Sequence, residues 1–451
     1  MDRRALLKSL LAAGVGATTF GATAGQMKLL NTFAQQQRFD DYKALICVFL
    51  YGGNDSYNML VPTESSDYGR YSVVRQNLAV PQESLISLNT TSSLPYSLGV
   101  PDYMTPISDL FHNQQLAWIN NVGPLEARVN KSEIKAKTAS LPPQLFSHND
   151  QQKLWERADN NLTGLSGWAG RIADLLSDVN PASPIPLNIS LAGNNVLQTG
   201  ETKPSYGITA DGADMFGGLD PRHNWNDKRI AVFDQLIAMD KHKIGGAYRD
   251  IVNRARSNAL VINQGLESIP RLTSTFNDNR FEDELHMVTK MISARETLSM
   301  QRQVFFVGLG GWDTHDRQND AHPELLAQLS NGLNSLNKAL VELGVNDNVT
   351  TFTMSEFGRT LTSNGDGTDH GWGGHQMVMG GAVNGGQLYG QMPSLELNSE
   401  DDYGDGRIIP TTASEQYSAT LAKWFGLSDA EIAMVFPHLS RFDLADLGFM
   451  G

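Results

Sequence analysis

Four continuous apolar runs constrain the fold of this chain more than any other feature of its sequence. A run without polar alternation predicts a strand that is buried on both faces, as in a sheet covered by helices. The runs are residues 44–51 (ALICVFLY), 116–122, 303–309 and 349–354. Helical patterns lie between and after them, at residues 151–158, 167–176, 283–300, 323–343 and 414–425. This alternation predicts an α/β fold with a mostly parallel central sheet and helices on both faces.

The composition along the chain indicates its division into parts. Residues 44–451 carry the strand and helix patterns, and we expect them to form a single domain that is long enough to bury a large core. Gly, Asp and Asn are dense near residues 193–227, where no apolar strand run is seen. We therefore expect an inserted cap at about residues 190–280. Residues 25–43 are interpreted as a linker.

The first 24 residues are typical of a twin-arginine export signal. Arg3 and Arg4 precede Lys8 and a weakly apolar run rich in small residues. A small-residue cleavage site ends at Ala24, and Ala34 is a second cleavage point. We therefore expect the twin-arginine export machinery as a partner and a soluble, periplasmic or secreted mature protein. The alternative interpretation is an ordinary amphipathic helix with two exposed arginines.

Charge and cysteine content exclude several classes of function. The 49 Asp and Glu outnumber the 35 Lys and Arg, which gives a net charge of −14. Nucleic acid is therefore not expected as a partner, because binding its backbone requires a positive face. Cys47 is the single cysteine, so disulfide frameworks and Cys-rich zinc or iron–sulfur sites are excluded. No run of 18 apolar residues occurs, so no membrane span is expected.

Polar residues with metal-binding chemistry follow three of the four apolar runs, in residues 52–56, 310–315 and 355–375. Ligands bind at the carboxyl ends of the strands in open α/β sheets, so these segments are expected to converge. Carboxylate and imidazole groups suit zinc, manganese or a similar divalent ion. They are supplied by Asp313, His315, Asp369, His370 and His375. Any one Asp–His pair is equally explained by a loop carboxylate beside a surface histidine, but the whole set predicts one or two metals.

Ser147 stands at the start of the helical pattern that begins near residue 148. A serine at this position caps a helix. The same position lies in the positive field of the helix end, which favours an alkoxide or an incoming anion. Next to a metal, the Ser147 hydroxyl would be a nucleophile. Ser56, beside Asp55, is the rival nucleophile.

Several familiar catalytic motifs are missing from the sequence. The nearest match to a G-x-S-x-G nucleophile elbow, residues 164–168, fails at its last position. No phosphate-cradling G-x-x-x-x-G-K-[ST] loop occurs. Residues 401–406 weakly resemble a calcium loop, but Thr412 stands where the loop needs Glu. A metal-independent esterase is therefore disfavoured.

The motifs in combination resemble a large bacterial family catalogued as domain of unknown function 1501. The resemblance runs from about residue 44 to residue 426. It rests on Gly52-Gly53-Asn54-Asp55, Ser147-His148 with Gln151 and Trp155, Gly310-Gly311-Trp312-Asp313-Thr314-His315, Ser355-Glu356-Phe357-Gly358-Arg359-Thr360, Gly367-Thr368-Asp369-His370-Gly371-Trp372-Gly373, Gly380-Gly381 and Gly386-Gln387-Leu388-Tyr389-Gly390. The family is placed with the alkaline-phosphatase-like superfamily of phosphatases, sulfatases and cofactor-independent phosphoglycerate mutases. The resemblance therefore implies an alkaline-phosphatase-like fold.

The same resemblance implies a plan for the site. It assigns Ser147 as the nucleophile at a helix start. It assigns metal binding to Asp55, Asp313, His315, Asp369, His370 and His375. Two departures from the superfamily leave the number of metals open, because only Thr314 separates Asp313 from His315 and because His375 lies closer than usual. The C/S-x-P-x-R motif of formylglycine sulfatases is missing, so that activity is disfavoured.

The leading hypothesis is an exported metal-dependent hydrolase of phosphate-type or related esters, with a small-molecule or polymer ester as substrate. Glu356 and Arg359 are interpreted as a supporting pair or, alternatively, Arg359 as an anion clamp for the substrate. The competing hypothesis is a non-catalytic binding or surface-assembly protein that keeps the fold, because a fold does not imply a function.

Overall fold

The computed structural model describes residues 38–451, except residues 90–96, 160–161, 216 and 240–242. The expected export signal and both cleavage points lie outside the described residues. The chain separates into two units, residues 1–41 and residues 42–451. The fold described below is that of the second unit. No described helix combines the length and the hydropathy that crossing a bilayer requires.

The helices confirm the helical patterns of the sequence and add others. The α-helices are α3 (Ser65–Arg75), α4 (Thr105–His112), α5 (Lys131–Ala136), α6 (His148–Arg157), α7 (Trp168–Leu175), α8 (Asp227–Met239), α9 (Lys243–Glu267), α10 (Arg280–Ser293), α11 (Gln318–Glu342), α12 (Ser414–Phe425) and α13 (Asp429–Val435). The five predicted helices correspond to α6, α7, α10, α11 and α12. The bounds of α12 agree with the prediction, and those of α6 and α7 differ from it by one to three residues. α11 begins five residues before its predicted start, and α10 ends seven residues before its predicted end.

The strands include all four that the apolar runs predict, namely β1, β5, β8 and β9. The full set is β1 (Lys43–Tyr51), β2 (Val61–Pro62), β3 (Leu85–Leu88), β4 (Leu98–Pro101), β5 (Leu116–Gly123), β6 (Asn188–Ser190), β7 (Tyr206–Gly207), β8 (Arg302–Gly310), β9 (Val349–Met354), β10 (Arg359–Ser363), β11 (Thr368–His370), β12 (Gly374–Met379), β13 (Leu388–Tyr389) and β14 (Thr412–Ala413).

The central sheet is mixed but mostly parallel. Its strand order is β13-β5-β12-β9-β1-β8-β6-β7, with β14 paired to β5. β1 pairs in parallel with both β8 and β9, so that Tyr51 lies opposite Gly310 and Phe49 opposite Met354. β12 is antiparallel to β9 and to β5. The predicted fold class is therefore confirmed, with β12 as an antiparallel insertion that the sequence did not reveal.

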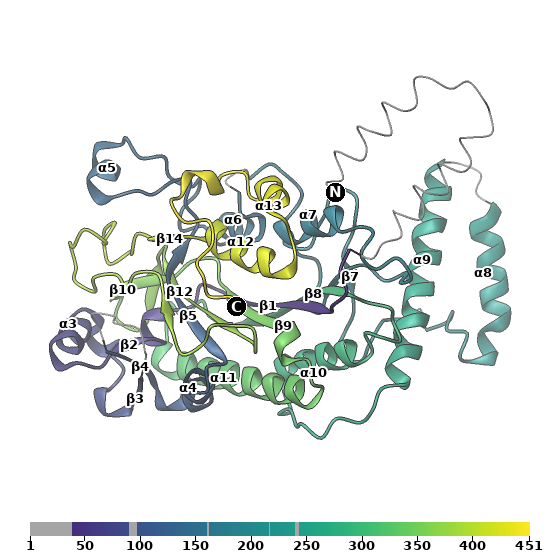
Figure 1. Ribbon diagram of the computed structural model, residues 1–451, viewed down its shortest axis with the longest axis horizontal. Helices are drawn as coiled ribbons and strands as arrows, with labels where there is room; N and C mark the ends of the chain where they lie inside the picture. Colours follow the sequence, from purple (N-terminus) through teal and green to yellow (C-terminus); the bar gives the residue numbers. More distant parts are fainter. Residues whose placement is uncertain (1–37, 90–96, 160–161, 216, 240–242) are drawn as a thin grey trace. The chain divides into compact units, whose positions relative to one another are not determined.

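Helices cover both faces of this sheet (Figure 1). Alternate residues of β1, from Ala44 to Leu50, pack in one apolar cluster with residues of α4, α10 and α11. On the opposite face, Phe352 of β9 contacts Trp168 of α7 and Tyr417 of α12, with ring centroids 5.8 and 6.2 Å apart. Burial on both faces explains why these strands are continuously apolar. Each large apolar side chain buried in this way contributes roughly 1.5–3 kcal/mol.

The segment expected to be a cap contains short strands and two long helices. β6 and β7 extend the sheet beyond β8, and α8 and α9 follow. Figure 1 shows α8 and α9 side by side, with α9 on the side of β7 and α8 beyond it. The role of this segment as a cap stays a prediction.

Candidate metal centre

The candidate site lies where three neighbouring parallel strands end. β8, β1 and β9 are adjacent, and the segments that follow them come together. Gly52, directly after β1, has a φ of +123°, a conformation that glycine adopts without strain. A Cβ atom at Gly52 would lie 2.3 Å from the backbone nitrogen of Asp313. Glycine at this position therefore allows the β1 and β8 loops to approach each other.

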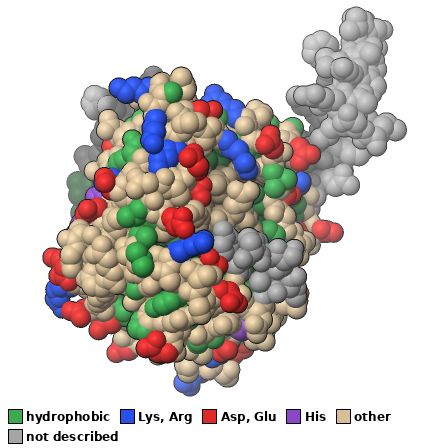
Figure 2. All heavy atoms as spheres, turned by 90° about the vertical axis from the view of Figure 1, so that its left-hand side faces the viewer, with side chains coloured by type: hydrophobic (Ala, Val, Ile, Leu, Met, Phe, Trp, Pro, Cys, Tyr) green, Lys and Arg blue, Asp and Glu red, His purple; other side chains and the backbone are tan. Residues whose placement is uncertain are grey.

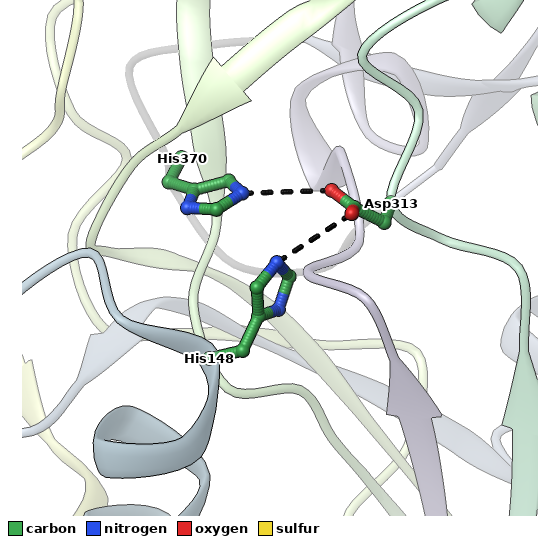
Figure 3. Close-up of side chains that lie close together, drawn as sticks. All are labelled: His148, Asp313 and His370. Atoms are coloured by element: carbon green, nitrogen blue, oxygen red, sulfur yellow. Dashed lines mark ion pairs between the residues drawn. The ribbon is translucent and has the colours of Figure 1, made fainter.

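Three side chains from distant parts of the chain meet at this edge (Figure 3). Asp313 follows β8, His370 ends β11, and His148 begins α6. One ligand atom from each of the three lies within 4.8 Å of the others. His148 Nε2 lies 3.6 Å from Asp313 Oδ2, and His370 Nε2 lies 3.5 Å from Asp313 Oδ1.

His315 brings a third imidazole to the same point. Its Nε2 atom lies 3.2 Å from Asp313 Oδ1 and 2.8 Å from His370 Nε2. Four ligands at the usual distance from zinc, about 2.0–2.2 Å, are about 3.3–3.6 Å from one another in a tetrahedron. The three separations from Asp313, 3.2–3.6 Å, match these edges, whereas the 2.8 Å between His315 and His370 is shorter than an edge. The donor set therefore fits a divalent cation.

The hydrogen bonds of the imidazole rings also fit a cation. His148 Nδ1 lies 2.9 Å from Glu356 Oε1, and His370 Nδ1 lies 2.8 Å from the carbonyl oxygen of Phe146. His315 Nδ1 lies 3.2 Å from Asp369 Oδ1. Each Nδ1 thus faces an acceptor, which favours a proton on Nδ1 and a lone pair on Nε2. Two such lone pairs 2.8 Å apart repel each other unless a cation or a proton lies between them.

The electrostatics of the group differ from residue to residue. The hydrogen bond that His148 donates to Glu356 raises the pKa of His148. Burial lowers the pKa of His370. Burial alone would raise the pKa of Asp313, but Arg359 outweighs it and holds this pKa below its ordinary value. Neutral His370 and ionised Asp313 are the forms that bind metals.

Arg359 is a supporting residue in this geometry. Its side chain is fully buried and pairs with Asp313. Its remaining contacts go to backbone oxygens, with Nε donating to Gly53 and Nη1 to Thr368. These contacts fix Asp313 and join the β1 loop to β11. A buried guanidinium with these partners does not fit the anion clamp that was one of the two interpretations of Arg359.

The structure places Asp55 in a different environment. Asp55 is fully buried, and its Oδ2 atom accepts hydrogen bonds from Arg75 and Gln318. Its Oδ1 atom has no hydrogen-bond partner within the described residues. Asp55 is not part of the group formed by His148, Asp313 and His370. The structure therefore does not bring this predicted ligand to the other predicted ligands.

His375 is also separate from that group. It lies on β12, where it is fully buried against the ring of Tyr57, with ring centroids 5.2 Å apart. Its Nδ1 atom accepts from the backbone nitrogen of Asn121 at 3.3 Å. Burial lowers the pKa of His375 to about 3. In this position His375 packs as a neutral core residue.

Ser147 stands at the N-cap of α6, as predicted. Its hydroxyl does not cap the backbone, but donates to Asp150 Oδ2 at 2.8 Å. The neighbours of Ser147 in the sequence both contact the candidate metal centre, Phe146 through its carbonyl oxygen and His148 through its ring. Ser56, the rival nucleophile, is buried, and its Oγ atom accepts from the backbone nitrogen of His375 at 2.8 Å.

His148 was not assigned to the site from the sequence, and Glu356 was predicted only as a supporting residue with Arg359. His148 is the first residue of α6 and was regarded only as a neighbour of Ser147. Glu356, which is buried, holds His148 and also accepts from the backbone nitrogen of Gly52 at 2.8 Å. A carboxylate behind a ligating imidazole is a usual second partner at metal sites. The sequence signal that could have identified His148 is its position directly after the predicted N-cap residue.

Comparisons with known proteins bear on the family of the chain. Residues 42–405 match the model of a family described as protein of unknown function (DUF1501). No curated protein matches the sequence.

Several solved structures are similar to this chain at low identity. The lipoteichoic acid synthase LtaP from Listeria monocytogenes is 8% identical, with a TM-score of 0.36 over 90% of this chain and 80% of that one. The soluble domain of lipooligosaccharide phosphoethanolamine transferase A from Neisseria meningitidis is 9% identical, with a TM-score of 0.33 over 87% and 90%. The PsFucS1 sulfatase from Pseudoalteromonas sp. is 10% identical, with a TM-score of 0.33 over 90% and 71%. TM-scores this low carry no argument about activity, so the activity is argued from the residues of this chain.

Proposed function

Because the chain belongs to the DUF1501 family, which is defined without an activity, we propose a function from the site: an exported, metal-dependent hydrolase of phosphate-type or related esters. One observation carries the proposal. The Nε2 atoms of three histidines and the carboxylate of Asp313 converge, while every Nδ1 atom faces an acceptor. Without a cation, the converging lone pairs and the carboxylate repel one another. A bound cation removes this repulsion, so a site of this kind favours binding one.

His148, His370, His315 and Asp313 would hold the metal, and Asp369 would support His315. Three imidazoles with one carboxylate favour zinc, with manganese as the second choice. A bound divalent cation would polarise an ester oxygen and lower the pKa of a coordinated hydroxyl or water. One metal is proposed here, because Asp55 and His375 lie outside the group that His148, Asp313 and His370 form.

The remaining residues position these ligands. Glu356 and the carbonyl oxygen of Phe146 fix the ring orientations of His148 and His370. Arg359 holds Asp313 from the protein interior. Asp313, His315 and Asp369 keep about half of their side-chain surface exposed, at 48, 43 and 53%. A substrate would therefore reach the site from the side of these three residues.

Ser147 is the proposed nucleophile. Its hydroxyl donates to Asp150 Oδ2, which would accept the proton as the Ser147 oxygen bonds to the phosphorus and the phosphorus–oxygen ester bond breaks. The alcohol of the ester would leave, and water would then release the phosphate from Ser147. The helix end-field contributes only about 0.3–1 kcal/mol, so it does not ionise the hydroxyl by itself. Activation of Ser147 would therefore depend on the metal, and changes at Ser147 and at the ligands should abolish the same activity.

The test is hydrolysis of a panel of aryl phosphate mono- and diesters, with metal content measured on the same samples. Ser147→Ala should abolish turnover and keep the metal. Ser147→Asp, which still caps a helix, should also be inactive. An active Ser147→Ala enzyme would exclude Ser147 as the nucleophile and point to a metal-bound water. Asn149→Ala, at an exposed position of the same helix, is the matched control and should keep activity.

Export by the twin-arginine pathway is part of the proposal and rests on the N-terminal sequence alone. Replacing both Arg3 and Arg4 with Lys should leave unprocessed protein in the cytoplasm. Processing and export of this variant at the wild-type level would contradict the pathway.

A second candidate function is a non-catalytic binding protein that keeps one metal. The observation that favours it is the pairing of Asp55 with Arg75, which occupies a carboxylate that a second metal would need. Wild-type protein that binds one metal, yet hydrolyses no ester in the panel, would support this candidate over the hydrolase.

A further inference from the structure

Exposed apolar side chains gather on the helical hairpin formed by α8 and α9, none of whose residues belongs to the candidate metal centre. Trp225, Val232 and Leu236 lie on or directly before α8, and Tyr248 and Ile251 lie on α9. Each of the five is more than half exposed. Isolated exposed apolar residues are normal on proteins, but a local concentration of large ones marks an interaction surface.

The helix α8 has two apolar faces. Ile230, Phe233 and Ile237 recur at helical spacing and are partly buried. Val232 and Leu236, one turn apart, form a second face that is exposed. A helix that packs on a protein needs one apolar face only. The second face is therefore available for a partner outside the described chain.

The hairpin is held together by specific contacts. Arg256 of α9 donates to Asp234 of α8 at 2.6 Å, and its guanidinium lies 5.8 Å from the ring centroid of Phe233. These contacts use the face of α8 that is turned to α9. Figure 1 shows the two helices side by side, beyond the edge of the sheet that ends in β7.

A groove runs along the exposed face of α8. It has a volume of about 530 Å³ and is lined by Val232, Leu236 and the loop residue Leu219, together with Lys228 and Arg229. Apolar side chains with adjacent cations are the combination that binds an anionic amphiphile. Both cations are exposed.

The charge of the hairpin is opposite to that of the rest of the chain. Residues 227–267, which span the hairpin, hold seven Lys and Arg against four Asp and one Glu, a charge of +2 in a chain of −14, which leaves −16 elsewhere. By contrast, acidic side chains are spread over the face shown in Figure 2, with basic ones interspersed. A symmetric dimer through two hairpins would bring the two positive surfaces together, so charge argues against a second copy as the occupant.

We propose that the α8–α9 hairpin docks the protein on an anionic lipid surface. The exposed apolar side chains would enter the interfacial region, and the Lys and Arg residues would attract the negative headgroups. Trp225 suits this position, because tryptophan favours the membrane–water interface. This proposal does not depend on the hydrolase function.

Binding can be followed through Trp225, the one exposed tryptophan of the described residues. Trp225 is 69% exposed, whereas each of the other six tryptophans, all within the described part of the chain, is at most 8% exposed. Vesicles of phosphatidylglycerol and phosphatidylcholine should shift the emission of the mature protein to the blue and carry it down on sedimentation. Vesicles of phosphatidylcholine alone should do neither, and added salt should weaken the binding. Trp225→Phe should lose the emission shift while most of the sedimentation remains.

Paired variants separate the two contributions. Lys228→Glu with Arg229→Glu should weaken binding to the anionic vesicles at least tenfold, and Val232→Ser with Leu236→Ser should do the same. Lys338→Glu on α11 and Val73→Ser on α3, at exposed positions elsewhere, are the controls and should change binding less than twofold. Circular dichroism establishes that each variant is folded.

Two results would overturn the proposal. One is equal binding to neutral and anionic vesicles, or no binding to either. The other is an oligomer in sedimentation that Val232→Ser with Leu236→Ser dissociates, which would make a second copy the occupant of the groove.

Discussion

Asp313 and Asp55 follow neighbouring parallel strands, and each is paired with a buried arginine, yet their surroundings differ. Asp313 is half exposed and lies among three imidazoles with free lone pairs. Asp55 is fully buried, and its hydrogen bonds come from the N–H groups of Arg75 and Gln318. N–H groups satisfy a carboxylate by hydrogen bonds. Imidazole nitrogens that carry lone pairs do not, and they can bind a cation together with the carboxylate. The partners of a carboxylate, more than its position after a strand, therefore decide whether it can bind metal.

The largest effect on stability is expected at Asp55. Asp55→Ala would leave Arg75, which is fully buried, without its charged partner. Removing one partner of a buried ion pair costs about 3–5 kcal/mol. We expect this loss in the free energy of unfolding from denaturant titration, together with unchanged binding of metal by the folded protein.

Asp313→Asn provides the contrast. The side chain is 48% exposed and Asn keeps an oxygen for Arg359, so the cost in stability should be about 1 kcal/mol or less. If Asp313→Asn destabilised the protein as much as Asp55→Ala, the two carboxylates would share a structural role and the comparison would fail. The double variant Asp55→Leu with Arg75→Met should recover part of the lost stability, because it removes both charges.

A pH-dependent effect is expected at a third carboxylate. Glu415, in the first turn of α12, is buried, and burial raises its pKa from 4.5 to about 8. The folded protein therefore keeps the Glu415 proton up to about pH 8, while the unfolded chain loses it above about pH 4.5. Stability from this group is present below pH 4.5 and is lost as the pH rises toward 8.

Glu415→Gln removes this dependence, because Gln resembles the protonated acid. The variant should match the wild type at pH 4.5 and exceed it by roughly 4 kcal/mol at pH 8. Thermal unfolding at the two pH values measures the difference. Equal stability of the two proteins at pH 8 would mean that folding does not raise the pKa of Glu415.

The sequence predicted the parts of the fold that depend on continuous patterns. The runs that became β1, β5, β8 and β9 are apolar throughout because both faces of the sheet are covered. β12 was missed because its sequence, GHQMVM, begins with glycine and carries two polar side chains in six residues. The core accepts Gln376 because its Oε1 atom accepts from the Thr353 hydroxyl at 2.8 Å, a contact between residues on different strands.

The site was predicted only in part, for a similar reason. Asp313, His315, Asp369 and His370 follow the strands or lie on a short strand of a loop, and the structure brings them together. His375 was predicted as a loop ligand, but it lies on β12 and packs into the core. The pairing of His148 with Glu356 joins residues 208 positions apart, and that of Asp55 with Arg75 depends on how α3 packs. Local spacing carries no information on either contact.

The most direct test of the account is a titration of zinc into metal-depleted wild-type protein and two variants. Isothermal calorimetry should give one strong site in the wild type. Asp55→Asn should keep this site, provided that circular dichroism shows it to be folded, and Asp313→Asn should lose it. A wild type without a stoichiometric site would contradict the account, as would a site that survives Asp313→Asn and disappears in folded Asp55→Asn.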